Sequence, residues 1–266
     1  MNNIKNTYIL TLIIFFLIAN AIWASPMDLE FQNQEQLILY IKNHNQLIKE
    51  NPLMAKYYLQ RADAFFLNNN FDKAVDDYSK ALKLDDKLNE AYLGRGLALA
   101  RAGWLEESID DLDIYIKRKP DSSFAYTKRG VRYLWLGNKN KARKDLQKAI
   151  QLDSQNAEAH DDLGVIFAQR MKYYEAADHF LSAIELDPSY HKAYHNMALI
   201  SYITGKDRIA LSFIENSLAL ASGSRESWLL KSKILNAIGN TSEADEAQEE
   251  AEFLPEGNWS ENIPIR

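Results

Sequence analysis

The sequence contains no cysteine, only ten glycines and no extended basic cluster, and each shortage excludes a class of protein. Without cysteine there is no disulfide, no thiol nucleophile and no lipid attachment through sulfur, which suits an oxidising compartment. The formal net charge is −6 and the longest basic run is Lys117 to Lys119, so nucleic acid is not expected as a partner. The sequence also lacks a glycine-rich phosphate loop and a serine nucleophile motif. We therefore predict a protein that is not an enzyme and needs no cofactor.

A long apolar run occurs at the amino-terminal end, where Lys5 precedes a stretch from Ile9 to Ala19 that a single threonine interrupts. Small residues follow, so residues 1–24 resemble a secretory signal peptide that is cleaved after Ala21 or Ala24. The apolar stretch is shorter than the ~20 residues that a spanning helix needs. We expect an exported protein, periplasmic or secreted. The alternative is an uncleaved segment that anchors the chain in a membrane.

What the sequence does contain is a period of 34 residues that extends over most of the chain. Small residues recur in one column, and aromatic or histidine rings recur four positions before them. The small column consists of Ala62, Gly96, Gly130, Gly164, Ala198 and Ser232. Apolar positions within each period are spaced by three and four, which predicts two amphipathic helices. The glycines that fall between these helices, where a left-handed residue ends the first one, are Gly103, Gly137, Gly205 and Gly239.

These columns resemble tetratricopeptide repeats, and the segments 91–112 and 157–188 carry that family's spacing of ring, small residue, turn, alanine and proline. The resemblance implies an all-α fold, a right-handed superhelical solenoid of antiparallel helix pairs. It implies six repeats, at 55–88, 89–122, 123–156, 157–190, 191–224 and 225–258. Residues 25–54 are expected to form a leading helix or degenerate half repeat, and residues 259–266 a tail.

The first three repeats each contain an arginine followed sixteen positions later by an aspartate, and the last three lose both residues together. The pairs are Arg61 with Asp77, Arg95 with Asp111, and Arg129 with Asp145. Joint loss predicts ion pairs at a partly buried seam, where an unpaired charge is unfavourable. The alternative is two independent surface preferences inherited by duplication.

The resemblance also implies that the first helices of the repeats line a concave surface that binds a partner. The residues that the resemblance assigns to this surface are Leu93, Leu97, Phe124, Lys128, Val131, Asp161, Asp162, Val165, His195, Asn196, Leu199 and Tyr202. A contiguous apolar strip of this kind usually marks a partner site. The alternative is that some of these residues pack between adjacent first helices.

The family's Lys, Asn and Arg clamp for acidic carboxy-terminal tails is absent, because Leu93, Leu97, Asp161 and Val165 stand where it would begin. Asp161 and Asp162 would repel a carboxylate. We therefore expect the partner to be a mixed apolar and basic peptide, or a helix with aliphatic anchors.

The sequence thus predicts a non-catalytic adaptor or scaffold, exported, that binds a protein or peptide segment on the concave face. A second hypothesis is a structural or assembly subunit of a membrane or envelope complex, anchored by its amino terminus. A third hypothesis is a zinc ion held by His191, His195, Asp161 and Asp162. Because these residues also suit ordinary helix surfaces, we predict no metal site.

Overall fold

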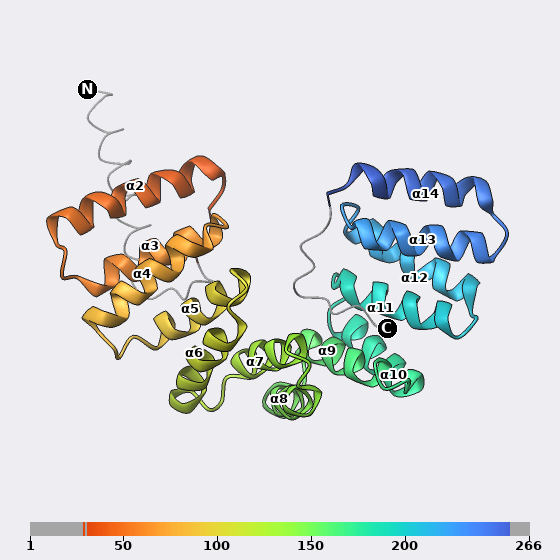
Figure 1. The fold of residues 1–266 in the computed structure, drawn as a ribbon, viewed down its shortest axis with the longest axis horizontal. Helices are drawn as coiled ribbons and strands as arrows, with labels where there is room; N and C mark the ends of the chain where they lie inside the picture. The colour runs from red at the N-terminus through yellow and green to blue at the C-terminus, as the bar shows by residue number, and fades with distance from the viewer. Residues whose placement is uncertain (1–28, 30, 256–266) are drawn as a thin grey trace, which may run out of the picture. The chain divides into compact units, whose positions relative to one another are not determined.

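The computed structural model describes residue 29 and residues 31–255, and this part of the chain is helical throughout (Figure 1). The helices are α2 (Gln34–Glu50), α3 (Ala55–Leu67), α4 (Phe71–Leu84), α5 (Asn89–Arg101), α6 (Leu105–Arg118), α7 (Ser123–Trp135), α8 (Lys139–Leu152), α9 (Ala157–Ala168), α10 (Tyr173–Leu186), α11 (His191–Ile203), α12 (Asp207–Leu220), α13 (Arg225–Ala237) and α14 (Thr241–Phe253). They form two compact units, one ending at Arg118 and the other beginning at Lys119. The predicted all-α fold class is confirmed.

Within each unit the helices pack as antiparallel pairs, and successive pairs pack on one another as in a tetratricopeptide solenoid. α2, α3–α4 and α5–α6 belong to the first unit, and α7–α8, α9–α10, α11–α12 and α13–α14 belong to the second. The first five pairs each enclose a bulky buried side chain of the second helix, such as Leu146 or Phe180. In the α13–α14 pair the equivalent residue is the exposed Gln248, and α14 buries only alanines. A Cβ atom on Gly130 would lie 3.0 Å from Cγ of Leu146, so the predicted small column permits close approach at the crossing.

Each turn between the two helices of a pair contains a residue in the left-handed region. Four of these residues are the predicted glycines, with φ between 72° at Gly205 and 91° at Gly103. The other two turns place Asn69 (φ 54°) and Met171 (φ 59°) in the same region. Asparagine tolerates this conformation, whereas an unbranched apolar side chain such as that of Met171 rarely adopts it.

The predicted arginine–aspartate pairs are confirmed as bidentate ion pairs. Arg95 donates from Nε and Nη2 to the two oxygens of Asp111, each at 2.7 Å, and the Asp111 side chain is 5% exposed. The other two pairs have the same geometry, with shortest distances of 2.6 Å for Arg61 to Asp77 and 2.7 Å for Arg129 to Asp145. Joint loss of both residues in the later pairs therefore reflects direct contact.

Arg95 also donates from Nη1 to Oγ of Ser79, which lies on the preceding α4. Arg61 makes the equivalent bond to Oδ1 of Asn45 on α2. A single guanidinium therefore ties its own helix pair together and connects that pair to the helix before it.

Helix α2 occupies the middle of the predicted leading segment and packs on α3. The predicted signal peptide and the predicted tail fall outside the described residues. Among the residues that are described, no helix combines the length and apolar character that crossing a membrane requires.

Candidate functional site

The twelve residues predicted to bind a partner are all at least partly covered in the free chain. Seven are buried, namely Leu93, Leu97, Val131, Asp161, Asp162, Val165 and Asn196. Five are half-buried, namely Phe124, Lys128, His195, Leu199 and Tyr202. Leu93 and Leu97 belong to the first unit and the other ten to α7, α9 and α11 of the second, and we call these ten the first-helix face.

Polar members of the first-helix face connect successive first helices. Lys128 on α7 forms an ion pair with Glu158 on α9, with 2.5 Å between Nζ and Oε1. Asn196 on α11 donates from Nδ2 to Oδ1 of Asp161 on α9 at 2.9 Å. His195 continues the series, since its Nδ1 lies 2.9 Å from Oγ of Ser227 on α13. Part of the predicted surface therefore holds neighbouring helix pairs together.

Asp162 is the exception, because its buried Oδ2 has no hydrogen-bond partner among the described residues. Burial raises the pKa of Asp162 well above its usual range, and the negative charges of Glu158 and Asp161 raise it further. Burial also raises the pKa of Asp161, to about 7, against the opposing effect of its hydrogen bond with Asn196. The pair is therefore incompletely ionised near neutral pH, and a positive charge supplied by a partner would favour its ionised form.

The residues of the zinc hypothesis do not assemble into a metal site. In the described part of the chain no group of three or more His, Cys, Asp or Glu side chains is placed to hold a metal ion. His195 contacts Ser227, and Asp161 contacts Asn196. Burial and the nearby His191 lower the pKa of His195 to about 4, so its ring is neutral at physiological pH.

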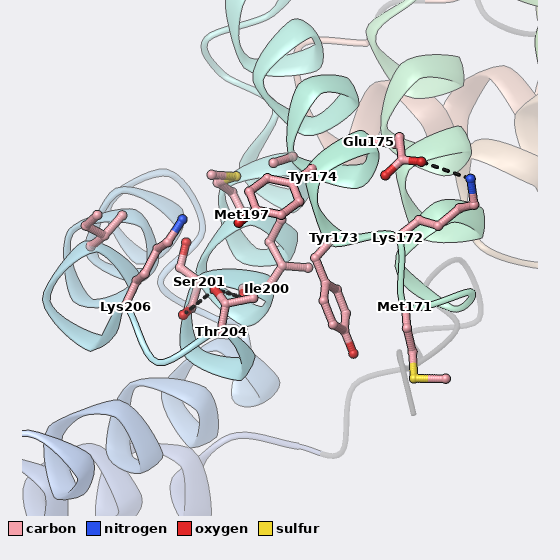
Figure 2. Close-up of a pocket in the computed structure, with 12 residues that line it drawn as sticks. Met171, Lys172, Tyr173, Tyr174, Glu175, Met197, Ile200, Ser201, Thr204 and Lys206 are labelled. Atoms are coloured by element: carbon pink, nitrogen blue, oxygen red, sulfur yellow. Dashed lines mark hydrogen bonds and ion pairs between the residues drawn. The ribbon is translucent and has the colours of Figure 1, made fainter.

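A pocket that the sequence did not predict lies between α10, α11 and the start of α12, with a volume of about 440 Å³. Figure 2 shows Met197, Ile200 and Ser201 of α11 on one side and Tyr173 and Tyr174 of α10 on the other. We call it the α11 pocket. The sequence does contain one sign of this pocket, because Ser201 departs from the repeat pattern. It does not show where Ser201 lies relative to α10.

Comparison with known proteins identifies the repeats in this chain. A family model described as TPR repeat matches residues 62–103, and a model described as Tetratricopeptide repeat matches residues 123–156. These two stretches therefore match tetratricopeptide repeats, and proteins built from such repeats typically act as non-catalytic adaptors that bind proteins or peptides. The division into six repeats with the predicted boundaries stays a prediction.

Among curated proteins, the chain is similar to the Protein SGT1 homolog of Oryza sativa subsp. japonica, with 38% identity over 80 residues. That match covers 28% of this chain and 22% of the rice protein. Among solved structures, it resembles a chain of the APC/C hetero-tetramer Cut9-Hcn1, with a TM-score of 0.72 and 18% identity over 81% of this chain and 42% of that one. A tetratricopeptide repeat protein from Parabacteroides merdae ATCC 43184 gives a TM-score of 0.71 with 19% identity, over 85% and 89% of the two chains. At these identities the structural matches show the fold alone.

Proposed function

We propose that this protein is a non-catalytic adaptor that holds a segment of a partner protein against the first-helix face. The observation that carries the proposal is Asp162, a buried carboxylate whose Oδ2 lacks a partner among the described residues, beside Asp161. A buried, ionised carboxylate without a hydrogen-bond partner is unfavourable unless a cation neutralises it. A lysine or arginine of a bound segment supplies that charge.

Apolar contacts come from the half-buried Phe124, Leu199 and Tyr202, which flank this acidic pair on α7 and α11. Full burial of such a side chain contributes roughly 1.5 to 3 kcal/mol. The buried Val131 and Val165 support the face from beneath and are unsuited to direct tests. The proposed partner is therefore a segment with aliphatic or aromatic anchors and at least one basic residue.

The proposal is tested with a peptide array in which each apolar peptide occurs in a basic and an acidic version. Basic versions should bind the full chain, and Asp162→Asn should weaken their binding at least tenfold. Asp178→Asn is the matched control, because it removes the same charge from an exposed residue of α10. Equal binding of basic peptides to the parent and to Asp162→Asn would contradict the proposal.

The pH dependence gives a second readout. A basic peptide pairs with ionised carboxylates, so its affinity should rise as the pH increases through about 7, the pKa of Asp161. The charges that bear on Asp162 are those of Glu158, Asp161, Lys128 and Lys192. An affinity that stays constant over this range would show that the acidic pair does not contact the peptide.

We also propose that the chain is exported, on the basis of the signal-like pattern of residues 1–24. Sequencing the amino terminus of the protein recovered from cells is the test. A mature chain beginning at Ile22 or Ser25 supports export, whereas a full-length chain held in membranes supports an anchored assembly subunit.

A further inference from the structure

The α11 pocket and the first-helix face lie on opposite sides of α11. With about 100° of rotation per residue, Met197, Ile200 and Ser201 project away from the side that carries Leu199 and Tyr202. The pocket residues come from α10, α11, the beginning of α12 and the turns that precede α10 and α12, all within the second unit. A ligand in the α11 pocket would therefore leave the first-helix face free.

The pocket occurs where the 34-residue pattern loses a large side chain. Ser201 stands in a column that is otherwise filled by bulky apolar residues. The other members of this column are Phe65, Leu99, Tyr133, Phe167 and Leu235. Ser201 is buried and lines the pocket, so the space that a ring would occupy is left open.

In two other helix pairs two cations lie close to the ring of this column. Phe65 has Arg61 at 5.7 Å and Lys73 at 5.5 Å from its ring centroid. Tyr133 has Arg129 at 5.9 Å and Lys141 at 5.0 Å.

The α11–α12 pair replaces both cations as well as the ring. Met197 takes the arginine position and Ile209 the lysine position, and both line the pocket. The three replacements together convert a filled ring site into an empty one with apolar walls.

Exposed apolar side chains surround this opening, at positions that are polar or glycine in every other helix pair. Tyr174 is 82% exposed, and its column otherwise holds Asp72, Glu106, Asn140, Arg208 and Ser242. Met171 is 76% exposed in a column of glycines and one asparagine, and it adopts the left-handed conformation that those residues favour. Ile209, 50% exposed, occupies a column that is otherwise charged. Exposed apolar residues gathered around a pocket typically mark a binding site.

The charges at the rim of the α11 pocket indicate which charge a ligand carries next to its apolar group. Lys172 is paired with Glu175, with 2.9 Å between Nζ and Oε1 (Figure 2). Lys206 has no carboxylate partner within the described residues, and its Nζ lies 5.9 Å from the centroid of the Tyr174 ring. The rim therefore carries one uncompensated positive charge, which complements an acidic residue of a ligand.

We infer that the α11 pocket receives a large apolar side chain, an aromatic ring above all, from a partner protein segment in which an acidic residue next to that anchor pairs with Lys206. The ring would occupy the space that Phe65 and Tyr133 occupy in their own helix pairs, with Met197 and Ile209 as its walls. The α11 pocket differs from the first-helix face in its position and in the ligand charge that it favours. Each of the two binding proposals can therefore hold without the other.

A library of random peptides displayed on phage and selected on the full chain tests this inference. Selected peptides should share an aromatic or large aliphatic residue with Asp or Glu within two positions. Their affinity should fall at least tenfold for Ser201→Phe, which fills the pocket, and for Ile209→Glu, which restores the charge of its column. Both substitutions introduce residues that other helix pairs of this chain carry at the same position, so the fold should tolerate them.

Trp104→Asn is the matched control, because Trp104 is 57% exposed in the first unit and the same column holds asparagine at 70, 138 and 240. This variant should bind the selected peptides like the parent. Unchanged binding to Ser201→Phe would overturn the inference, as would a selection without common features. Selected basic peptides that lose affinity only for Asp162→Asn would support the first-helix face and refute the pocket.

The chain's own carboxy-terminal residues are the competing occupant, since Trp259, Glu261 and Ile263 combine a ring, an acid and an aliphatic side chain. Replacing Trp259 and Ile263 by serine in the full chain separates the two cases. Unchanged peptide affinity supports a partner protein. An increase of tenfold or more would show that the tail fills the pocket and would overturn the assignment to a partner.

Discussion

Substitution of Arg95 by methionine should destabilise the α5–α6 pair by leaving the carboxylate of Asp111 buried without its partner. Methionine is chosen because Met197 holds the equivalent position in the α11–α12 pair. The Asp111 side chain is 5% exposed, and burial already raises its pKa against the opposing effect of Arg95. Removal of Arg95 leaves the burial effect unopposed.

The size of the effect can be estimated from Asp161, a buried aspartate that lacks an arginine. Burial raises the pKa of Asp161 from 3.8 to about 7, which at about 1.4 kcal/mol per unit corresponds to an upper limit of roughly 4 kcal/mol. Arg95 is 24% exposed, so water screens part of its interaction with Asp111. We therefore expect Arg95→Met to reduce the free energy of unfolding by about 2 to 3 kcal/mol near neutral pH.

The effect should depend on pH with a defined sign. In the variant, the folded-state pKa of Asp111 lies above its unfolded-state value, so the folded state holds its proton more tightly. Stability should therefore fall as pH rises from about 4 towards neutrality and recover on acidification. The parent chain, with its ion pair intact, should show a smaller change over the same range.

Chemical denaturation followed by circular dichroism measures the loss, and hydrogen exchange locates it, because repeat proteins unfold in parts. The double variant Arg95→Met with Asp111→Phe reproduces the pair Met197 and Phe213 and should recover most of the stability. A loss below about 0.5 kcal/mol for Arg95→Met would refute the reasoning, since this is the size of an ordinary surface change. So would a double variant whose loss equals the sum of the two single losses.

Two further predictions concern backbone positions. Gly94→Ala should destabilise the first unit by about 1 to 3 kcal/mol in chemical denaturation, because its Cβ would overlap the buried Tyr78 ring; Gly223→Ala, with no atom within 4 Å, is the control and should change stability little. Met171→Gly should increase the free energy of unfolding by about 1 kcal/mol and so raise the unfolding midpoint, because glycine adopts the left-handed conformation without strain. A lower midpoint for Met171→Gly would show that the side chain, despite its exposure, contributes to packing.

The fold could be predicted because its determinants recur. Four glycine turns, the small column at the helix crossing and the three arginine–aspartate pairs are each visible as a period, and the structure confirms all of them. Repetition also predicts which residues change together. The positions equivalent to Arg95 and Asp111, for example, are both replaced in the last three helix pairs.

The candidate site could be predicted only in part, because a period does not show how deeply a residue is buried. The sequence placed Asp161, Asp162 and Asn196 on a binding face, but not the hydrogen bond between Asp161 and Asn196 or the unpartnered oxygen of Asp162. The α11 pocket depends on contacts between α10, α11 and α12. Ser201 was recognisable as a departure, yet only the packing of those helices shows that it leaves a space.

The placement of the arginine–aspartate bonds also has an evolutionary consequence. Each such pair is complete within one 34-residue segment, and the additional bond from Arg95 or Arg61 reaches only the nearest preceding helix. Duplication or deletion of a whole segment would therefore carry both charges together and leave no orphaned aspartate. Recombination between segments can thus lengthen or shorten such a chain in single steps, provided that the new neighbour offers an oxygen acceptor to the guanidinium.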